Sequence, residues 1–213
     1  MDFFGFFRSS ASYRCRIAFN LKGLSYRFHP VNTRNNEQNA ASYLSRNPQG
    51  LVPTLEIDGR ILTQSLAIIE WLEERHPSPA LLPSDPFERA EVRAFALAIA
   101  CDLHPLNNLR VLDYLKERLG QDQTAIAEWY RHWTQSGLAA CEELVVRAGR
   151  TKPYCFGKTP GLADICLVPQ LFNARRFDCN LSAVPTLVAI DRACAELPAF
   201  AEAHPDRQPD AVP

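Results

Sequence analysis

The sequence predicts an α/β plus all-α protein, in which a domain built on a mixed sheet of about four strands precedes an all-helical domain. Strand and helix patterns alternate over residues 1–76, four prolines fall within residues 77–86, and no strand pattern survives after them. Alternating strands and helices are typical of an α/β unit, whereas closely spaced prolines mark a stiff linker. We therefore expect one domain over residues 1–79 and a second over residues 87–213.

The first strand and the first helix meet in the most informative stretch of the chain. Phenylalanines within residues 3–7 predict a buried strand, three serines follow within four residues, and a helical pattern then begins. Serine is a preferred N-cap, and the free N–H groups and positive dipole of a helix start attract anions. Because Arg8, Arg14 and Arg16 flank it, this junction suits a thiolate, a carboxylate or a phosphate. A capped helix with solvated arginines is the simpler alternative.

Alternation and turn residues predict the rest of the sheet. Gly23 suits the end of the first helix, and Tyr26 and Phe28 in alternation predict a strand over residues 25–31. Asp58-Gly59 is a favoured two-residue turn and predicts a hairpin. The other expected segments are a loop, a short helix and the two hairpin strands, at residues 32–37, 38–45, 54–57 and 60–63.

Two further junctions in the first domain suit a ligand. Val52-Pro53 stands just before a strand, where proline is tolerated, and a cis bond there would expose the Val52 backbone to a ligand. The alternative is a plain turn. Ser65 is expected to cap a helix over residues 66–76, which would give a second helix start that favours anions.

The second domain is predicted to be helical throughout. Pro105 must kink a long run over residues 87–119, because its ring removes a hydrogen bond and crowds the preceding turn. Asp164 can accept a hydrogen bond from the N–H of Gly161. The other expected helices cover residues 125–146, 165–176, 185–196 and 199–203, and the residues after His204 are expected to be loose.

Polar residues interrupt the long helical run beside its proline. His104 and Asn108 are four residues apart and would share a helix face. Such groups are either solvated or line a cleft, and the apolar residues between them favour a cleft wall. Arg175 and Arg176 end a later helix, where cations are favourable in any case.

Charge and composition exclude several classes of function. The chain of 213 residues has a formal net charge of -1, so we expect no nucleic-acid partner. It has neither an apolar run long enough to span a membrane nor a secretion signal. Its seven cysteines are scattered without a CxxC pair, which predicts reduced thiols in the cytoplasm and no metal site. Cys15 lies inside a helical pattern, which favours a small core residue over a nucleophile.

Five motifs in order resemble the zeta class of the glutathione transferases. They are RSSASYRCRIA at residues 8–18, NPQGLVPTL at 47–55, QSLAIIEWL at 64–72, HPLNNLR at 104–110 and GLAD at 161–164. The first resembles the class signature Ser-Ser-Cys-x-Trp-Arg-x-Arg-Ile-Ala, although Ala11 replaces its cysteine and Tyr13 its tryptophan. The resemblance covers nearly the whole chain and implies a thioredoxin-like domain followed by a helical domain, the glutathione transferase fold.

This resemblance implies glutathione as the cofactor and a small dicarboxylate as the substrate. The implied reaction converts maleylacetoacetate to fumarylacetoacetate, a step of tyrosine and phenylalanine catabolism, by thiolate addition, bond rotation and elimination. A free thiol has a pKa of roughly 8.5, and a helix start or nearby cations can lower that pKa by a unit or more. The resemblance also implies a homodimer.

Carried over residue by residue, the resemblance implies three groups of site residues. Ser9, Ser10 and Arg14 would activate the thiol, and either serine could be the one that acts. The glutathione contacts would be Ser9, Ser10, Gln38, Val52, Pro53, Gln64, Ser65, His104 and Asn108. The substrate carboxylates would be bound by Arg8, Arg110 and Arg176, because arginine pairs with carboxylate in an orienting, bidentate way.

Three other functions are compatible with the same residues. One is maleylpyruvate isomerisation in aromatic (gentisate) degradation, since both substrates are cis dicarboxylates with a neighbouring keto group. Another is a general zeta-class glutathione transferase or dehalogenase. The third is a glutathione-binding protein without catalysis, against which the intact pairs Ser9-Ser10 and Gln64-Ser65 argue.

Overall fold

The computed structural model describes residues 1–149 and 153–211 and divides into two compact units. The first contains Met1–Leu81 together with the residues from Ala195 onward, and the second contains Leu82–Cys194. This division differs from the sequence-based one at its C-terminal end, since the last helix belongs with the first unit. The physical reason is the packing of α9 (Pro198–Ala203) on α1 (Ser10–Leu21).

The predicted mixed sheet of four strands is confirmed. Its strands are β1 (Asp2–Gly5), β2 (Arg27–Pro30), β3 (Thr54–Ile57) and β4 (Arg60–Thr63), in the spatial order β2-β1-β3-β4. β1 pairs parallel with β2 and antiparallel with β3, which forms the predicted hairpin with β4. The turn residues Asp58 and Gly59 both have positive φ, as a tight hairpin requires.

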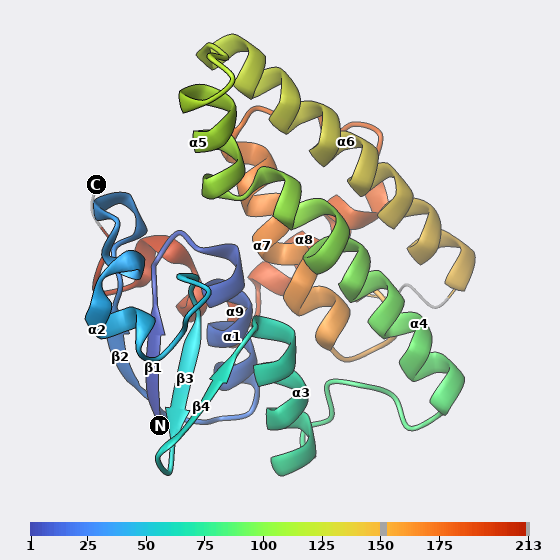
Figure 1. The fold of residues 1–213 in the computed structure, drawn as a ribbon. Helices are drawn as coiled ribbons and strands as arrows, with labels where there is room; N and C mark the ends of the chain where they lie inside the picture. The colour runs from blue at the N-terminus through green and yellow to red at the C-terminus, as the bar shows by residue number, and fades with distance from the viewer. Residues whose placement is uncertain (150–152, 212–213) are drawn as a thin grey trace. The chain divides into compact units, whose positions relative to one another are not determined.

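Helices cover both faces of this sheet. Figure 1 shows α1 and α3 (Ser65–Arg75) on one side and the short α2 (Ala41–Leu44) on the other. Two short 3-10 turns, Thr33–Asn35 and Glu37–Asn39, precede α2 within the predicted loop and short helix. The core between the sheet and its helices is apolar and fully buried, with Phe3, Phe19, Leu55, Ile68 and Leu72 at its centre.

A buried lysine ties the far ends of α1 and α3 to the proline-rich stretch. The Lys22 ammonium lies 2.6 Å from a Glu73 carboxylate oxygen and 2.6 Å from each of the His76 and Pro79 carbonyl oxygens. Three acceptors match its three N–H donors, which offsets the cost of burying the charge. The Lys22 contacts at this end of the first unit therefore stabilise the fold.

The described residues after His204, which end at Ala211, pack within the first unit, so the expectation of a loose tail is wrong for them. A short 3-10 turn, Pro205–Arg207, follows α9, and Pro205 is buried. Asp210 then accepts a hydrogen bond from the Phe7 N–H at 2.9 Å. Tertiary contacts hold a segment whose own composition favours disorder.

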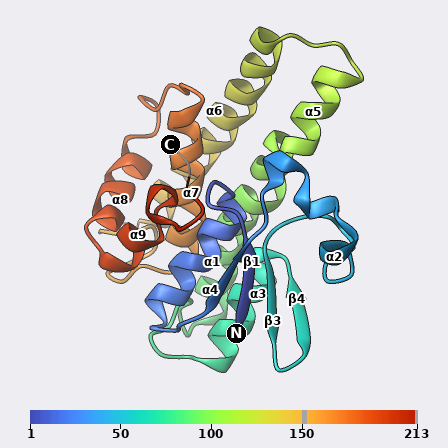
Figure 2. The ribbon, with the colours of Figure 1, turned by 90° about the vertical axis from the view of Figure 1, so that its left-hand side faces the viewer.

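The second unit consists of helices. They are α4 (Pro86–Leu97), a π-helical turn (Ala98–Leu103), a 3-10 turn (His104–Asn107), α5 (Leu109–Glu117), α6 (Gln123–Ala148), α7 (Leu162–Arg176) and α8 (Pro185–Ala195). Figure 2 shows α5 and α6 as neighbours, and they are in contact. The single helical run predicted over residues 87–119 is thus interrupted between α4 and α5 by the π-helical turn and the 3-10 turn.

The break in the long run has a packing cause besides Pro105. Leu103, in the π-helical turn, lies against Gly137 of α6, where an added Cβ would come within 2.5 Å of the leucine side chain. Only glycine gives that approach room, so the turn is seated directly on the α6 backbone. Pro105 is then the second residue of a 3-10 turn that begins at His104, where the α-helix does not continue.

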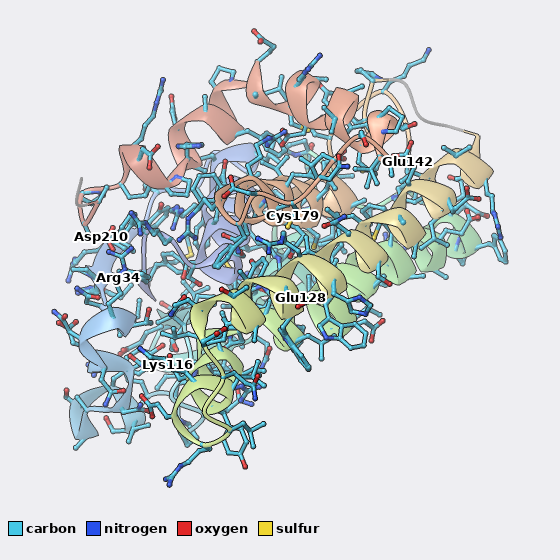
Figure 3. The ribbon with its side chains drawn as sticks, turned by 90° about the horizontal axis from the view of Figure 1, so that it is seen from above. Arg34, Lys116, Glu128, Glu142, Cys179 and Asp210 are labelled. Carbon is cyan, nitrogen blue, oxygen red and sulfur yellow. The ribbon has the colours of Figure 1, made fainter. Side chains whose placement is uncertain are left out.

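Two buried carboxylates fix helix starts in this unit. As predicted, Asp164 accepts a hydrogen bond from the Gly161 N–H at 2.8 Å, and its other oxygen accepts from the Cys155 N–H at 2.9 Å. Glu142, on α6, does the same for α8 by accepting from the Thr186 and Leu187 N–H groups at 2.9 Å each (Figure 3). Burial raises the pKa of Asp164.

Among the described helices, none combines the length and the apolar character that crossing a bilayer demands.

Candidate functional site

The start of α1 follows β1 after a short segment and is capped as predicted. Ser9 is the N-cap, with an extended backbone, and its Oγ accepts a hydrogen bond from the Ser12 N–H at 3.2 Å. A hydroxyl also carries one donor, so the O–H of Ser9 can donate to an anion at this helix start. Ser10 is the first helical residue and is only 3% exposed, whereas Ser9 is half-buried.

The start of α3 is built differently, and the expectation that Ser65 caps it is wrong. Gln64 is the N-cap, with φ of 68° and ψ of 118°, and among the described residues no side chain caps the helix. This unusual backbone makes Ser65 already helical, and its Oγ instead accepts a hydrogen bond from Arg14 at 3.2 Å. The first N–H groups of α3 therefore stay available to an anion.

Arg14 lies beneath this uncapped start and connects the two helices. Its side chain is 2% exposed, and one of its terminal nitrogens donates to Ser65. The other two guanidinium nitrogens are buried and find no hydrogen-bond partner within the described chain. A buried cation with spare donors favours a nearby anion, because such groups are otherwise costly. The residues present thus fit a cofactor that carries a carboxylate.

The segment before β3 is held close to the start of α3. Gln64 donates through its side-chain amide to the Gln49 side-chain oxygen at 2.9 Å. The peptide bond between Val52 and Pro53 is cis, one of the two possibilities the sequence left open. The carbonyl of Leu51, just before it, accepts hydrogen bonds from two side chains at 2.6 Å. The Val52-Pro53 segment is therefore rigidly supported.

Gln38 lies in the second 3-10 turn of the first unit. Its amide nitrogen donates to the Asn36 side-chain oxygen at 3.2 Å, while its own oxygen is buried and lacks a partner in the described structure. Gly50 packs against this turn, since an added Cβ would lie 2.6 Å from the Asn39 side chain. The turn carrying Gln38 is thus joined to the segment that leads to Val52.

The three arginines near the start of α1 have different environments. Arg16 is fully buried and donates to the backbone oxygens of Ala203 and Phe7 at 3.0 Å each. Burial lowers its pKa to about 10, and its protein contacts make it a structural residue. Arg8 is half-buried and lies over the Phe7 ring, 5.1 Å from its centroid. Among these three, Arg8 and Arg14 are the ones suited to anions.

In the second unit, His104 and Asn108 do not share a helix face as expected. His104 begins the 3-10 turn, whereas Asn108 is the extended N-cap of α5 and accepts a hydrogen bond from the Arg110 N–H at 3.2 Å. The spacing of four residues fails because the helix is interrupted between them. Arg110 itself lies exposed in the first turn of α5.

Arg176 ends α7 and is held by aromatic rings. Its guanidinium carbon lies 5.8 Å from the Phe172 ring centroid and 5.6 Å from the Phe177 ring centroid. It also donates to the Asn173 side chain at 3.2 Å, yet the residue is exposed. Arg175, in contrast, pairs with Asp191 at 2.6 Å. Arg176 is therefore an oriented cation that can still reach a ligand.

Sequence reasoning missed residues that support this arrangement. Gln49 contacts the predicted site residue Gln64, and Asp210 contacts Phe7, which precedes Arg8, but neither belongs to a pattern that predicts such a contact. The only signal for Gln49 is its place inside a matched motif. In the part of the chain that the structure describes, no cluster of histidine, cysteine or acidic side chains is arranged to hold a metal ion.

Comparisons with known proteins agree with this architecture. The family model for the glutathione S-transferase N-terminal domain matches residues 3–80. A maleylacetoacetate isomerase of Rhizobium meliloti is 50% identical over 204 residues, which cover 96% of this chain and 95% of the relative. A solved bacterial zeta-class maleylpyruvate isomerase has a TM-score of 0.98 and 46% identity, with both chains covered completely. A maleylacetoacetate isomerase of Anaeromyxobacter dehalogenans, solved with glutathione in its active site, has a TM-score of 0.89 and 46% identity, with 99% of this chain and 97% of that one covered.

Proposed function

Because the chain belongs to the zeta class of the glutathione transferase family, we propose that it is a glutathione-dependent cis–trans isomerase that converts maleylacetoacetate to fumarylacetoacetate. The observation that carries this proposal is the pair of helix starts joined by Arg14. One start offers a serine hydroxyl, and the other offers uncapped N–H groups above a buried cation. A thiol cofactor with a carboxylate needs both features.

Glutathione, when bound, supplies a thiolate that adds reversibly to the cis double bond and so permits rotation about it. We assign its γ-glutamyl carboxylate to the N–H groups at the start of α3, with Gln64 and Ser65 beside it. Arg14 supplies positive charge beneath that position. Gln38, Val52 and Pro53 would hold the rest of the peptide, and the backbone of Val52 would form the hydrogen bonds.

Ser9 is the residue that we assign to thiol activation. Its O–H can donate to a thiolate while its oxygen caps α1, and a donated hydrogen bond lowers the pKa of the thiol. The positive end of α1 acts in the same direction, since a helix start lowers thiol pKa values. Ser10 is nearly fully buried, so we give it a supporting role. Each unit by which the thiol pKa is lowered is worth about 1.4 kcal/mol.

The substrate is a dianion, and we assign its carboxylates to arginines. Arg8 and Arg176 each lie over a phenylalanine ring, which restricts the orientation of the guanidinium group. Arg110 completes the set of substrate cations. His104 and Asn108 are proposed to contact glutathione, as the resemblance implies.

Maleylpyruvate is the second candidate substrate. The solved zeta-class structure with a TM-score of 0.98 is a maleylpyruvate isomerase, and the match covers both chains completely. Both substrates present two carboxylates and a keto group beside a cis double bond, so the same arginines would bind either. We further propose that the enzyme is a cytoplasmic homodimer.

A paired assay tests the proposed function. Freshly generated maleylacetoacetate and maleylpyruvate are each followed spectroscopically with the wild-type enzyme, with and without glutathione. We expect isomerisation that depends on glutathione and favours maleylacetoacetate. Faster turnover of maleylpyruvate would reverse the order of the two substrates. Turnover without glutathione, or conjugation of aryl or haloacid substrates without isomerisation, would contradict the proposal.

A further inference from the structure

The residues that follow α9 return to the segment between β1 and α1. Asp210 accepts a hydrogen bond from the Phe7 N–H at 2.9 Å across 203 positions of sequence (Figure 3 labels Asp210). Phe7 is 1% exposed and immediately precedes Arg8 and Ser9. The carboxylate therefore acts on the backbone that carries two of the proposed site residues.

The same peptide segment is held from its other side by Arg16. Its guanidinium donates to the Phe7 carbonyl at 3.0 Å and to the Ala203 carbonyl at 3.0 Å. Both backbone polar groups of Phe7 are thus fixed, the N–H by Asp210 and the carbonyl by Arg16. Ser9 donates its own N–H to the Phe6 carbonyl at 3.0 Å, so the segment is closed into a tight turn before the helix starts.

The Asp210 carboxylate occupies a costly environment. One of its oxygens is buried and has no hydrogen-bond partner among the described residues. Burial raises the pKa of Asp210, while the Phe7 hydrogen bond and the charge of Arg16 act in the opposite direction. Burying a carboxylate oxygen without a partner costs free energy, and the hydrogen bond to the Phe7 N–H is the contact that offsets this cost.

We propose that Asp210 is a positioning residue, which orients Ser9 and Arg8 by fixing the peptide of Phe7 together with Arg16. This inference rests on the proposed function, because it concerns the serine assigned to thiol activation. Loss of the carboxylate frees the Phe7 N–H and lets the turn before α1 relax. The hydroxyl of Ser9 then moves away from the thiol of bound glutathione, and the pKa of that thiol rises.

The test compares three variants of the full-length chain with wild type. Asp210→Ala removes the acceptor, Asp210→Asn keeps an oxygen that can accept from Phe7, and Asp206→Ala is the matched control. Asp206 lies in the same C-terminal segment and its side chain is 77% exposed. The thiol pKa of bound glutathione is measured from the ultraviolet absorbance of the thiolate across pH, and kcat, KM and Tm are measured in parallel.

We expect Asp210→Ala to raise the thiol pKa of bound glutathione by about 0.5 to 1 unit, which lowers kcat/KM about 3- to 10-fold at pH values below that pKa. Asp210→Asn should restore most of the wild-type thiol pKa, and Asp206→Ala should not change it. A lower Tm with an unchanged thiol pKa and unchanged kinetics would overturn the inference and leave Asp210 with a purely structural role.

A further variant and a measurement on glutathione alone make the test independent of folding defects and of the isomerase activity. If Asp210→Ala does not fold, Asp210→Glu displaces the carboxylate by one methylene, and an unchanged thiol pKa in that variant would equally contradict the inference. The thiol pKa is read from glutathione alone, without isomerase substrate. A wild-type enzyme that binds glutathione but isomerises neither substrate would therefore disprove the proposed function, while the shift in Asp210→Ala would still support the positioning role.

Discussion

The helices α1 and α3 both follow a strand and begin at hydroxyl residues, but only α1 is capped by the side chain of its own N-cap residue. In α1, Ser9 caps the helix through the Ser12 N–H. In α3, the positive φ of Gln64 places Ser65 inside the helix, and its hydroxyl turns to Arg14. A serine at a helix start therefore caps the helix only when its own backbone is extended, as that of Ser9 is, and not when the serine is already helical, as Ser65 is. The uncapped start of α3, next to Arg14, is the one where we expect an anion to bind.

A third helix start, that of α7, differs from both because the Asp164 carboxylate accepts hydrogen bonds there. Asp164→Ala would remove the acceptor of the part-buried Gly161 N–H and of the fully buried Cys155 N–H. We expect the free energy of unfolding to fall by about 3 kcal/mol or more, since each such group costs about 1–3 kcal/mol. Urea denaturation measures the loss. A loss below about 1 kcal/mol would mean that water replaces the carboxylate.

Ser9→Ala tests whether the capped start of α1 also serves chemistry. The substitution removes both the cap and the proposed donor to the thiolate. We expect kcat/KM to fall about 100-fold, as when one preorganised donor is lost, and the free energy of unfolding to fall by about 1 kcal/mol. Steady-state kinetics and denaturation provide the two values. Ser10→Ala is the matched control, and a larger kinetic loss in Ser10→Ala would transfer the assignment to Ser10.

Arg14→Met tests the uncapped start of α3. Methionine keeps much of the apolar volume but removes the guanidinium beneath the helix start. We expect glutathione to bind about 10-fold more weakly, equivalent to about 1.4 kcal/mol, with little loss of stability because a buried cation with spare donors is removed. Calorimetric titration and Tm separate the two effects. A large fall in Tm with unchanged affinity would show that Arg14 is structural.

Substitutions at Gln64, which has a positive φ, are expected to have a smaller effect on the free energy of unfolding. Gln64→Ala and Gln64→Gly both remove the contact with Gln49, but only glycine adopts the positive φ without strain. We expect the glycine variant to exceed the alanine variant by about 1 kcal/mol in free energy of unfolding. Equal stabilities in urea titrations of the two variants would contradict a strained start of α3.

The smallest effect is a pH dependence at the start of α7. Burial raises the pKa of Asp164 above its ordinary value of 3.8, so the folded state retains the proton to higher pH than the unfolded state. This contribution to stability is present at low pH and is lost as the pH rises through the folded pKa. Asp164→Asn lacks the dependence. Unfolding in urea at several pH values should therefore show wild type losing stability relative to this variant as the pH rises.

Much of the fold could be predicted because its determinants are local. The hairpin at Asp58-Gly59, the cap at Ser9 and the contact between Asp164 and Gly161 each involve residues within a few positions of one another. Backbone preferences and short hydrogen bonds decide such features before the chain is compact. Local sequence patterns are therefore enough to predict the strands, the main helices and the two helix starts suited to anions.

The contacts made by these helix starts depend instead on residues that are distant in sequence. The contact of Arg14 with Ser65 spans 51 positions, and that of Asp210 with Phe7 spans 203. The break of the long helix at Leu103 depends on the room beside Gly137 of another helix. Each of these depends on which groups are buried together, because a buried polar group must find its partner wherever the chain supplies one. No local sequence pattern predicts which distant residues form these contacts.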